Sequence, residues 1–135
     1  MAQEFSWNPA YSVGNVLLDK QHQKLLALCA EAAACMADDS RAGKEQFHAI
    51  LHELCNYADV HFETEEALLA RHNYPGLSEQ HAEHTEYRAQ LCDFLFAATT
   101  GTLDKAGLHQ YLSIWWQHHI LESDMQYSKF LREGG

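Results

Sequence analysis

The chain has 135 residues, a size that suits one hydrophobic core, and we expect a single domain over 1–135. Its formal net charge is −10, from nine Lys and Arg against nineteen Asp and Glu, and this balance predicts no nucleic-acid partner. No apolar run approaches the roughly 20 residues of a membrane span, and residues 1–7 do not resemble a secretory signal. We therefore expect no membrane association and a cytoplasmic location.

Residues 1–18 predict an irregular arm, because this segment contains Pro9, Gly14 and several aromatic residues. A first helix is expected after Asp19, which we interpret as its cap, and the turn at 38–40 ends it. The stripe that repeats at three- and four-residue steps along this helix is His22, Leu25, Leu26, Cys29, Ala33 and Met36.

The second and third helices are bounded by strong start and stop signals. The second is expected from after Ser40 to about His72, where Asn73 and the 75–76 Pro-Gly pair follow. The third is expected after Ser78 and ends at Gly101. The core-facing stripe of the second helix is Phe47, Ile50, Leu51, Leu54, Ala58, His61, Phe62, Glu65 and Leu68. That of the third is Gln80, His84, Tyr87, Leu91, Phe94 or Leu95, and Ala98.

A fourth helix is expected after Thr102, which we interpret as its cap, and it frays near 132–135. Its stripe is Leu108, Tyr111, Leu112, Trp115 and His119. Short connections between long amphipathic helices make neighbours antiparallel. The sequence therefore predicts an all-α fold: an up-down-up-down antiparallel four-helix bundle over about 19–132, preceded by the arm.

The composition is unusual in its ten histidines, whereas the four cysteines form no Cys-x-x-Cys pair. We interpret Cys29, Cys35, Cys55 and Cys92 as small buried apolar residues. The histidines are more informative, because several of them lie inside apolar stripes together with polar partners. These groups are His22, then His61 with Glu65, then Gln80 with His84, then His119 with Asp124.

Residues four apart on a helix share one face, with Cβ atoms about 5 to 6 Å apart, so His61 and Glu65 can coordinate one metal or bridge two. Antiparallel packing of the first two helices brings His61 and Glu65 to the same height along the bundle as His22, which lies near the start of the first helix. The third and fourth helices bring their candidate ligands to the same height if they continue to alternate in direction. The hypothesis is a buried two-metal site, and mixed imidazole and carboxylate ligands suit iron better than calcium or magnesium.

Several histidines leave alternatives open. His48 and His52 are also four apart, but they lie off the apolar stripe, so we interpret them as solvated. His118 and Glu122 are four apart, whereas His119 and Asp124 are five apart, a turn of about 140° on an ideal helix. Helical spacing alone therefore favours His118 over His119. Periodicity does not dismiss His72 or His81 either.

The sequence resembles the hemerythrin family, and in particular the small stand-alone bacteriohemerythrins, over nearly its whole length. The motifs that carry the resemblance are Trp7-Asn8 with Tyr11-Ser12-Val13-Gly14, Asp19-Lys20-Gln21-His22, His61-Phe62-Glu63-Thr64-Glu65-Glu66, Tyr74-Pro75, Glu83-His84, and Trp115 through His119-Ile120 to Asp124.

The resemblance implies a four-helix bundle that holds two iron ions, joined by an oxo or hydroxo bridge. The implied ligands are His22 and His61 for one iron, His84 and His119 for the other, and Glu65 and Asp124 as bridges. The closing motif of the family has the five-residue spacing, so the resemblance favours His119 over His118.

The sequence departs from the family at one position. Four residues before His84, where the family has its fifth histidine, the chain has Gln80, with His81 beside it. An amide oxygen is a weaker ligand than an imidazole, so Gln80 is either a seventh ligand or a residue that lines an open position. His81 reaches the metal only if the first helical turn tightens. We expect Gln80, rather than His81, to face the iron.

The function that the resemblance implies is reversible binding of dioxygen, as a carrier, store or sensor. The first alternative is a di-iron redox enzyme that acts on peroxide, dioxygen or nitric oxide through an open iron position at Gln80. The second alternative is an iron buffer whose site does no redox chemistry. The sequence predicts dioxygen as the small-molecule ligand and identifies no protein partner.

Overall fold

The structure is a computed structural model that describes residues 5–132, and this part of the chain is helical with no strand. Four long helices are α1 (Val16–Cys35), α2 (Arg41–Arg71), α3 (Leu77–Thr100) and α4 (Lys105–His118). A π-helical segment, η3 (His119–Asp124), continues α4 into α5 (Met125–Arg132), and a short 3-10 turn, η2 (Pro9–Tyr11), lies in the arm. The first four arm residues and the fraying expected at 133–135 lie outside the described residues.

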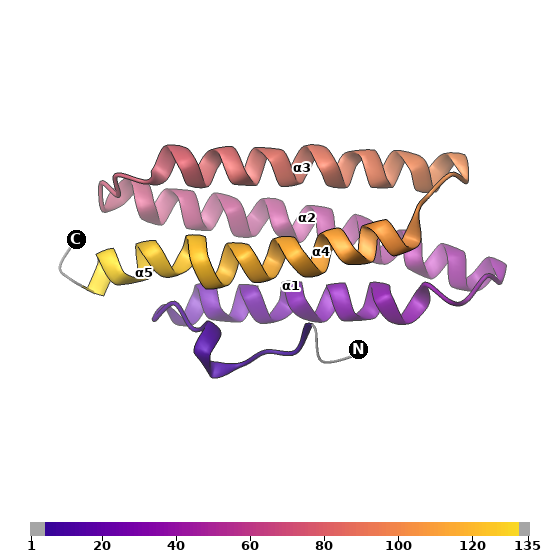
Figure 1. Cartoon of the computed structure of the whole chain (residues 1–135), viewed down its shortest axis with the longest axis horizontal. Coiled ribbons are helices and arrows are strands. Elements are labelled where there is room, and N and C mark those ends of the chain that lie inside the picture. The colour runs from indigo at the N-terminus through magenta and orange to yellow at the C-terminus, as the bar shows by residue number, and fades with distance from the viewer. Residues whose placement is uncertain (1–4, 133–135) are drawn as a thin grey trace.

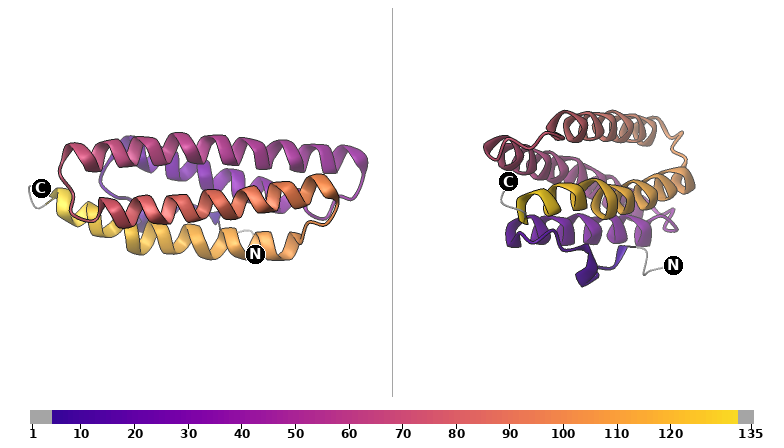
Figure 2. Two further views of the ribbon diagram at one scale, coloured as in Figure 1. Left: turned by 90° about the horizontal axis from the view of Figure 1, so that it is seen from above. Right: turned by 60° about the vertical axis from the view of Figure 1, so that its left-hand side comes forward.

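The helices run side by side along the long axis of the molecule and alternate in direction (Figures 1 and 2). Contacts join α1 to α2, α2 to α3 and α1 to α4. The prediction of an antiparallel four-helix bundle is therefore confirmed. The arm packs on the bundle: the ring of Phe5 meets that of His109 on α4 edge to face, and Ser128 in α5 donates a hydrogen bond to the carbonyl of Val13.

The helix ends follow capping chemistry, with two corrections to the sequence analysis. Ser40 caps α2 as predicted, and Gly101 ends α3 with φ 77°, a left-handed conformation that favours glycine. Asp19 does not cap α1, because Asn15 does so and the helix starts earlier. Thr102 does not cap α4 either, since the Asp104 side chain accepts the hydrogen bond from the N–H of Gly107.

Asp19 has a different role, which helical periodicity does not reveal. Its carboxylate accepts hydrogen bonds from the Ser12 hydroxyl (2.6 Å) and from the Val13 N–H (2.9 Å). Both donors belong to the arm, so Asp19 fixes the arm to the first turn of α1. It contributes a carboxylate near a helix N-terminus, where the helix dipole stabilises negative charge.

The apolar core is divided along the bundle. A large cluster contains Phe62, Tyr87 and Trp116, and a smaller one contains Val13, Leu18, Leu69 and Tyr127. Between these clusters along the helices lie the buried polar side chains. The cysteine prediction is right for Cys29, which is buried, and wrong for Cys92, which is exposed on α3. Cys35 and Cys55 are half-buried.

Among the residues that the structure describes, no helix combines the length and the apolar character that crossing a bilayer requires.

Candidate metal centre

Six side chains from the helices meet in the polar layer between the two apolar clusters, and each of them is 0% exposed. They are His22 of α1, His61 and Glu65 of α2, His84 of α3, and His119 and Asp124 of the π-helical segment η3. Their ligand atoms form two groups, His22, His61, Glu65 and Asp124 in the first, and Glu65, His84 and His119 in the second. The structure therefore brings together all six residues that the sequence analysis singled out.

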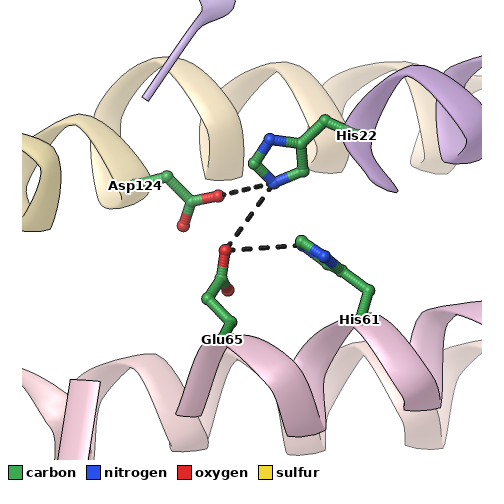
Figure 3. A group of neighbouring side chains, drawn as sticks. All are labelled: His22, His61, Glu65 and Asp124. Carbon is green, nitrogen blue, oxygen red and sulfur yellow. Dashed lines mark ion pairs between the residues drawn. The ribbon is translucent and has the colours of Figure 1, made fainter. Parts of the chain in front are cut away.

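Figure 3 shows the first group, in which His22 points toward both carboxylates and His61 toward Glu65. The Nε2 atom of His22 lies 3.0 Å from Oδ2 of Asp124 and 3.6 Å from Oε2 of Glu65. The Nε2 atom of His61 lies 3.4 Å from the same Oε2 atom. One oxygen of each carboxylate is thus directed at the His22 and His61 pair.

The second group uses the other oxygen of each carboxylate. Oε1 of Glu65 lies 3.0 Å from Nε2 of His84 and 3.3 Å from Nε2 of His119. Oδ1 of Asp124 lies 3.1 Å from Nε2 of His119. Each carboxylate therefore spans the two imidazole pairs, which is the placement that a ligand shared by two ions requires.

The π-helical segment explains why His119, and not His118, lies in this site. An ideal α-helix turns residues five apart away from each other, whereas the wider π-helical turn stacks them on one face. His119 and Asp124 accordingly point inward together. His118 lies on the exposed surface and pairs with Glu122. The expectation from ideal helical spacing is wrong at this point because the helix is not α-helical there.

Several ligand atoms of the site have no hydrogen-bond partner, and this is the main evidence that the residues fit metal ions. The Nε2 atoms of His22, His61 and His84, and Oδ2 of Asp124, are buried without a hydrogen-bond partner. Buried polar atoms left unpaired are costly. Cations at the points where these atoms converge would satisfy them, and the nitrogen and oxygen donors fit two iron ions.

The electrostatics of the site depend on burial and on the two carboxylates. Burial lowers the pKa of His61 to about 4. Burial also opposes charge on His22 and His119, but the adjacent carboxylates outweigh it and raise the pKa of His22 to about 9 and that of His119 to about 10. Burial alone would raise the pKa of Glu65, yet the surrounding imidazoles hold it well below its usual value.

Asp124 behaves differently from Glu65. Burial and the negative charge of Glu65 raise the pKa of Asp124. Two buried carboxylates therefore lie close together, and their negative charges need positive charge nearby. Protonated imidazoles supply part of that charge. Metal cations supply the same charge compensation and displace those protons, so metal binding and proton release are coupled at this site.

A second layer of polar side chains orients three of the four imidazoles, and it was not predicted from the sequence. His61 donates from Nδ1 to the Gln21 amide oxygen (2.8 Å) and His84 to the Glu66 carboxylate (2.6 Å). His119 donates to the Glu83 carboxylate at 3.2 Å. These bonds place the proton of each ring on Nδ1 and leave Nε2 free as a ligand.

The acceptors have a signal in the sequence, because each is adjacent to a candidate ligand. Gln21 precedes His22, Glu66 follows Glu65, and Glu83 precedes His84. Each of these acceptors lies beside the buried face of its own helix and contacts an imidazole from another helix. Which imidazole it meets depends on helix packing, and sequence spacing does not contain that information.

Tyr127 and Ser123 extend this layer. The Tyr127 hydroxyl donates a hydrogen bond to Oε2 of Glu65 at 2.7 Å, and the Ser123 hydroxyl lies 2.8 Å from the carboxylate oxygens of Glu83. Both residues follow or belong to the π-helical segment. The segment therefore contributes ligand candidates and the groups that orient them.

Gln80 faces the site and His81 does not. The Gln80 side chain is 3% exposed, and its amide nitrogen donates to the carbonyl of Ser123 (3.1 Å) and to Oδ1 of Asp124 (3.2 Å). Its amide oxygen is buried without a hydrogen-bond partner. The His81 side chain is 61% exposed and pairs with Glu66 at 2.9 Å. Gln80 is thus oriented by two acceptors and keeps one free oxygen.

The remaining histidine alternatives lie on the surface. His72 is exposed at the end of α2. His52 is exposed and His48 is half-buried, and their Nε2 atoms contact each other at 3.2 Å.

Aromatic rings cover one end of the metal centre. Phe62 stacks on the His84 ring, with centroids 3.9 Å apart, and Trp115 stacks on the His119 ring at 4.5 Å. Trp116 is fully buried and donates from its indole N–H to the Tyr87 hydroxyl. The tryptophans are core residues, and they keep water away from this end of the site.

Comparisons with known proteins agree with this geometry. The hemerythrin HHE cation binding domain matches residues 13–131. A hemerythrin-like protein of Naegleria gruberi is 32% identical over 127 residues, which cover 94% of this chain and 93% of that protein. The bacteriohemerythrin of Clostridium acetobutylicum is 26% identical over 126 residues (91% and 98%), and the myohemerythrin of Riftia pachyptila is 28% identical over 123 residues (91% and 90%). Because the domain match spans most of the chain, the chain belongs to the hemerythrin family of non-haem di-iron, oxygen-binding proteins.

Proposed function

We propose that this chain binds dioxygen reversibly at a di-iron centre and serves as an oxygen carrier, store or sensor. The observation that supports this most directly is the arrangement of Glu65 and Asp124. Both carboxylates are fully buried, and each directs one oxygen at each pair of imidazoles. This arrangement holds two cations next to each other in a site closed to solvent.

In this proposal the six buried residues are the metal ligands. His22 and His61 would hold one iron, His84 and His119 would hold the other, and Glu65 and Asp124 would be shared by both. Two bound iron ions would supply the redox chemistry that reversible dioxygen binding requires. The protein contributes the positions of the ligands and the environment around them.

The surroundings of the site favour binding over turnover. Phe62, Trp115 and Trp116 form an apolar wall on one side, and Leu18 and Tyr127 belong to the apolar cluster on the other. An apolar interior excludes the water that would protonate a reduced ligand and release it, and it makes uncompensated charge costly. Binding in such a site reverses more readily than it leads to products.

The second layer keeps three of the four imidazoles in one orientation throughout binding and release. Gln21, Glu66 and Glu83 accept the Nδ1 protons of His61, His84 and His119. The Tyr127 hydroxyl donates to Glu65, which limits rotation of that carboxylate. Imidazoles that are already oriented need little rearrangement when dioxygen binds or leaves.

Gln80 supports a second candidate function, a redox enzyme that acts on peroxide, dioxygen or nitric oxide. Its amide replaces an imidazole that the family has, and its nitrogen is held by Ser123 and Asp124. Only the oxygen of Gln80 is then available to an adjacent iron, and an amide oxygen is a weak ligand for it. A weakly bound or open position at this iron admits water or a second substrate.

Exposure of the anaerobic ferrous protein to air, followed by removal of oxygen, distinguishes these functions. Reversible binding produces a visible charge-transfer absorption band that disappears on deoxygenation and returns on re-exposure. Rapid and irreversible loss of the band supports the enzyme. A protein that retains two irons per chain and shows no band at all acts as an iron buffer, and retention of fewer than two metals contradicts the di-iron proposal.

A further inference from the structure

The helices α2 and α3 are antiparallel neighbours (Figures 1 and 2). Glu66 of α2 contacts His81 of α3 at 2.9 Å, and Asp59 contacts Arg88 at 2.8 Å. Asp59 lies seven residues before Glu66 on α2, and Arg88 lies seven residues after His81 on α3. Seven residues are about two helical turns, so both contacts lie on the same side of this helix pair.

One further turn along the same side leads to a pair of thiols. Four residues before Asp59 is Cys55, and four residues after Arg88 is Cys92. Residues four apart lie on one face of a helix. The register therefore places Cys55 and Cys92 opposite each other across the boundary between α2 and α3.

The two thiols differ in their environment. Cys92 is exposed, whereas Cys55 is half-buried at the edge of the large apolar cluster. Burial raises the pKa of Cys55 to about 11, and the nearby Cys92 and Asp59 add to this rise. The influence of Cys92 on Cys55 is an independent sign that the two side chains are neighbours. Cys29 is buried in the core, and Cys35 is the last residue of α1.

We propose that Cys55 and Cys92 form a reversible thiol–disulfide site that links α2 to α3 in the presence of a low-molecular-weight disulfide. The thiolate of Cys92 attacks one sulfur of oxidised glutathione, which forms a mixed disulfide and releases one glutathione thiolate. The thiolate of Cys55 then attacks Sγ of Cys92 and releases the second glutathione. The protein loses two electrons and two protons, and the small disulfide is reduced to two thiols.

The order of attack follows from exposure. The exposed Cys92 meets the reagent first, whereas Cys55 is half-buried, and burial raises its pKa. The second step therefore limits the rate and becomes faster as the pH rises. Because α2 carries His61 and Glu65 and α3 carries His84, the link also joins two helices that together supply three of the six candidate ligands.

The test is incubation of the full-length, iron-loaded protein with oxidised glutathione, followed by blocking of free thiols and mass spectrometry without reduction. Trypsin separates the two cysteines into peptides 45–71 and 89–105. The expected result is a disulfide-linked pair of these peptides, and an intact chain whose mass is two hydrogen atoms below that of the reduced chain. The yield of the link does not change when the protein is diluted. Reduction reverses the link, and the linked protein unfolds several degrees higher than the reduced one.

Single substitutions identify the steps. Cys55→Ser stops the reaction at a glutathione adduct on peptide 89–105, and Cys92→Ser gives neither adduct nor link. Cys35→Ser is the matched control, and it leaves the link unchanged. A wild-type protein that keeps the adduct on Cys92 without forming the link overturns the proposal, and so does a link that depends on protein concentration. Circular dichroism verifies that each variant is folded.

Discussion

Nε2 of His119 lies 3.1 Å from Oδ1 of Asp124, although five residues separate them in the sequence. The π-helical segment makes this contact possible, because its wider turn aligns residues that an α-helix would turn away from each other. The segment also places Ser123 and Tyr127 against Glu83 and Glu65. A local departure from α-helical geometry thus supplies two of the six candidate ligands.

The π-helical geometry predicts that exchanging two neighbouring residues removes metal. The double variant Ser123→Asp and Asp124→Ser moves the carboxylate to four residues after His119, which an ideal α-helix would tolerate. In the observed geometry it turns the carboxylate out of the site, so we expect fewer than two irons per chain by metal analysis. Glu122→Ala, on the exposed face, is the control and retains both. Full iron content in the exchanged variant would contradict the structural role of the π turn.

Loss of an imidazole acceptor weakens metal binding without removing a ligand. Glu83→Ala deletes the acceptor of the His119 Nδ1 proton and of the Ser123 hydroxyl. We expect ferrous affinity to fall by about 10- to 100-fold, measured anaerobically by competition with a chromophoric chelator. Glu83→Gln keeps an acceptor oxygen and restores part of the affinity. The exposed Glu63→Ala is the matched control, and an equal loss in that variant would show that the effect is only one of surface charge.

We predict that the residue at position 80 affects the lifetime of the oxygenated protein. Gln80→His introduces an imidazole that occupies the position left weak by the amide, and we expect slower autoxidation than in the wild type. The measurement is the decay of the charge-transfer band in air-saturated buffer. His81→Ala is the control, because His81 pairs with Glu66 outside the site. If Gln80→His leaves the decay unchanged while His81→Ala abolishes one iron, the roles assigned to these two residues are reversed.

Metal-free protein loses stability as the pH rises above neutrality. The pKa of His22 is raised from 6.5 to about 9 and that of His119 from 6.5 to about 10, because buried carboxylates adjoin them. A raised pKa in the folded state stabilises it fully below pH 6.5, and this stabilisation is lost as the pH rises toward 9 and 10. The free energy of unfolding falls by up to about 1.4 kcal/mol per pH unit for each imidazole.

Chemical denaturation of chelator-treated protein between pH 6.5 and 9 measures this loss. The metal-loaded protein is the control, because its ligand nitrogens carry no proton in the folded state and the same decline is absent. A metal-free protein whose unfolding free energy is constant or increases over this range would show that His22 and His119 are not protonated next to the carboxylates.

The sequence by itself determined the helices and the identity of the inward-facing polar residues. His61 and Glu65 are four apart within a long apolar stripe, and that spacing alone places both on the buried face of α2. The stop at Gly101 was also predictable, since glycine adopts the left-handed conformation at little cost. The N-terminal caps were harder to predict. Asp19 and Thr102 resemble caps in the sequence, but the structure has Asn15 as the cap of α1 and Asp104 as the cap of α4.

Tertiary structure alone decided the relationships between helices. Ideal helical spacing favoured His118, the resemblance to the family favoured His119, and the π-helical turn is the structural reason that His119 faces the site. The acceptors Gln21, Glu66 and Glu83 are visible in the sequence, but their partners lie on other helices. Cys55 and Cys92 become a pair only through the register of α2 and α3. Periodicity records which face of a helix is buried, whereas the residue met across that face depends on the rotation and axial shift of each helix against its neighbours.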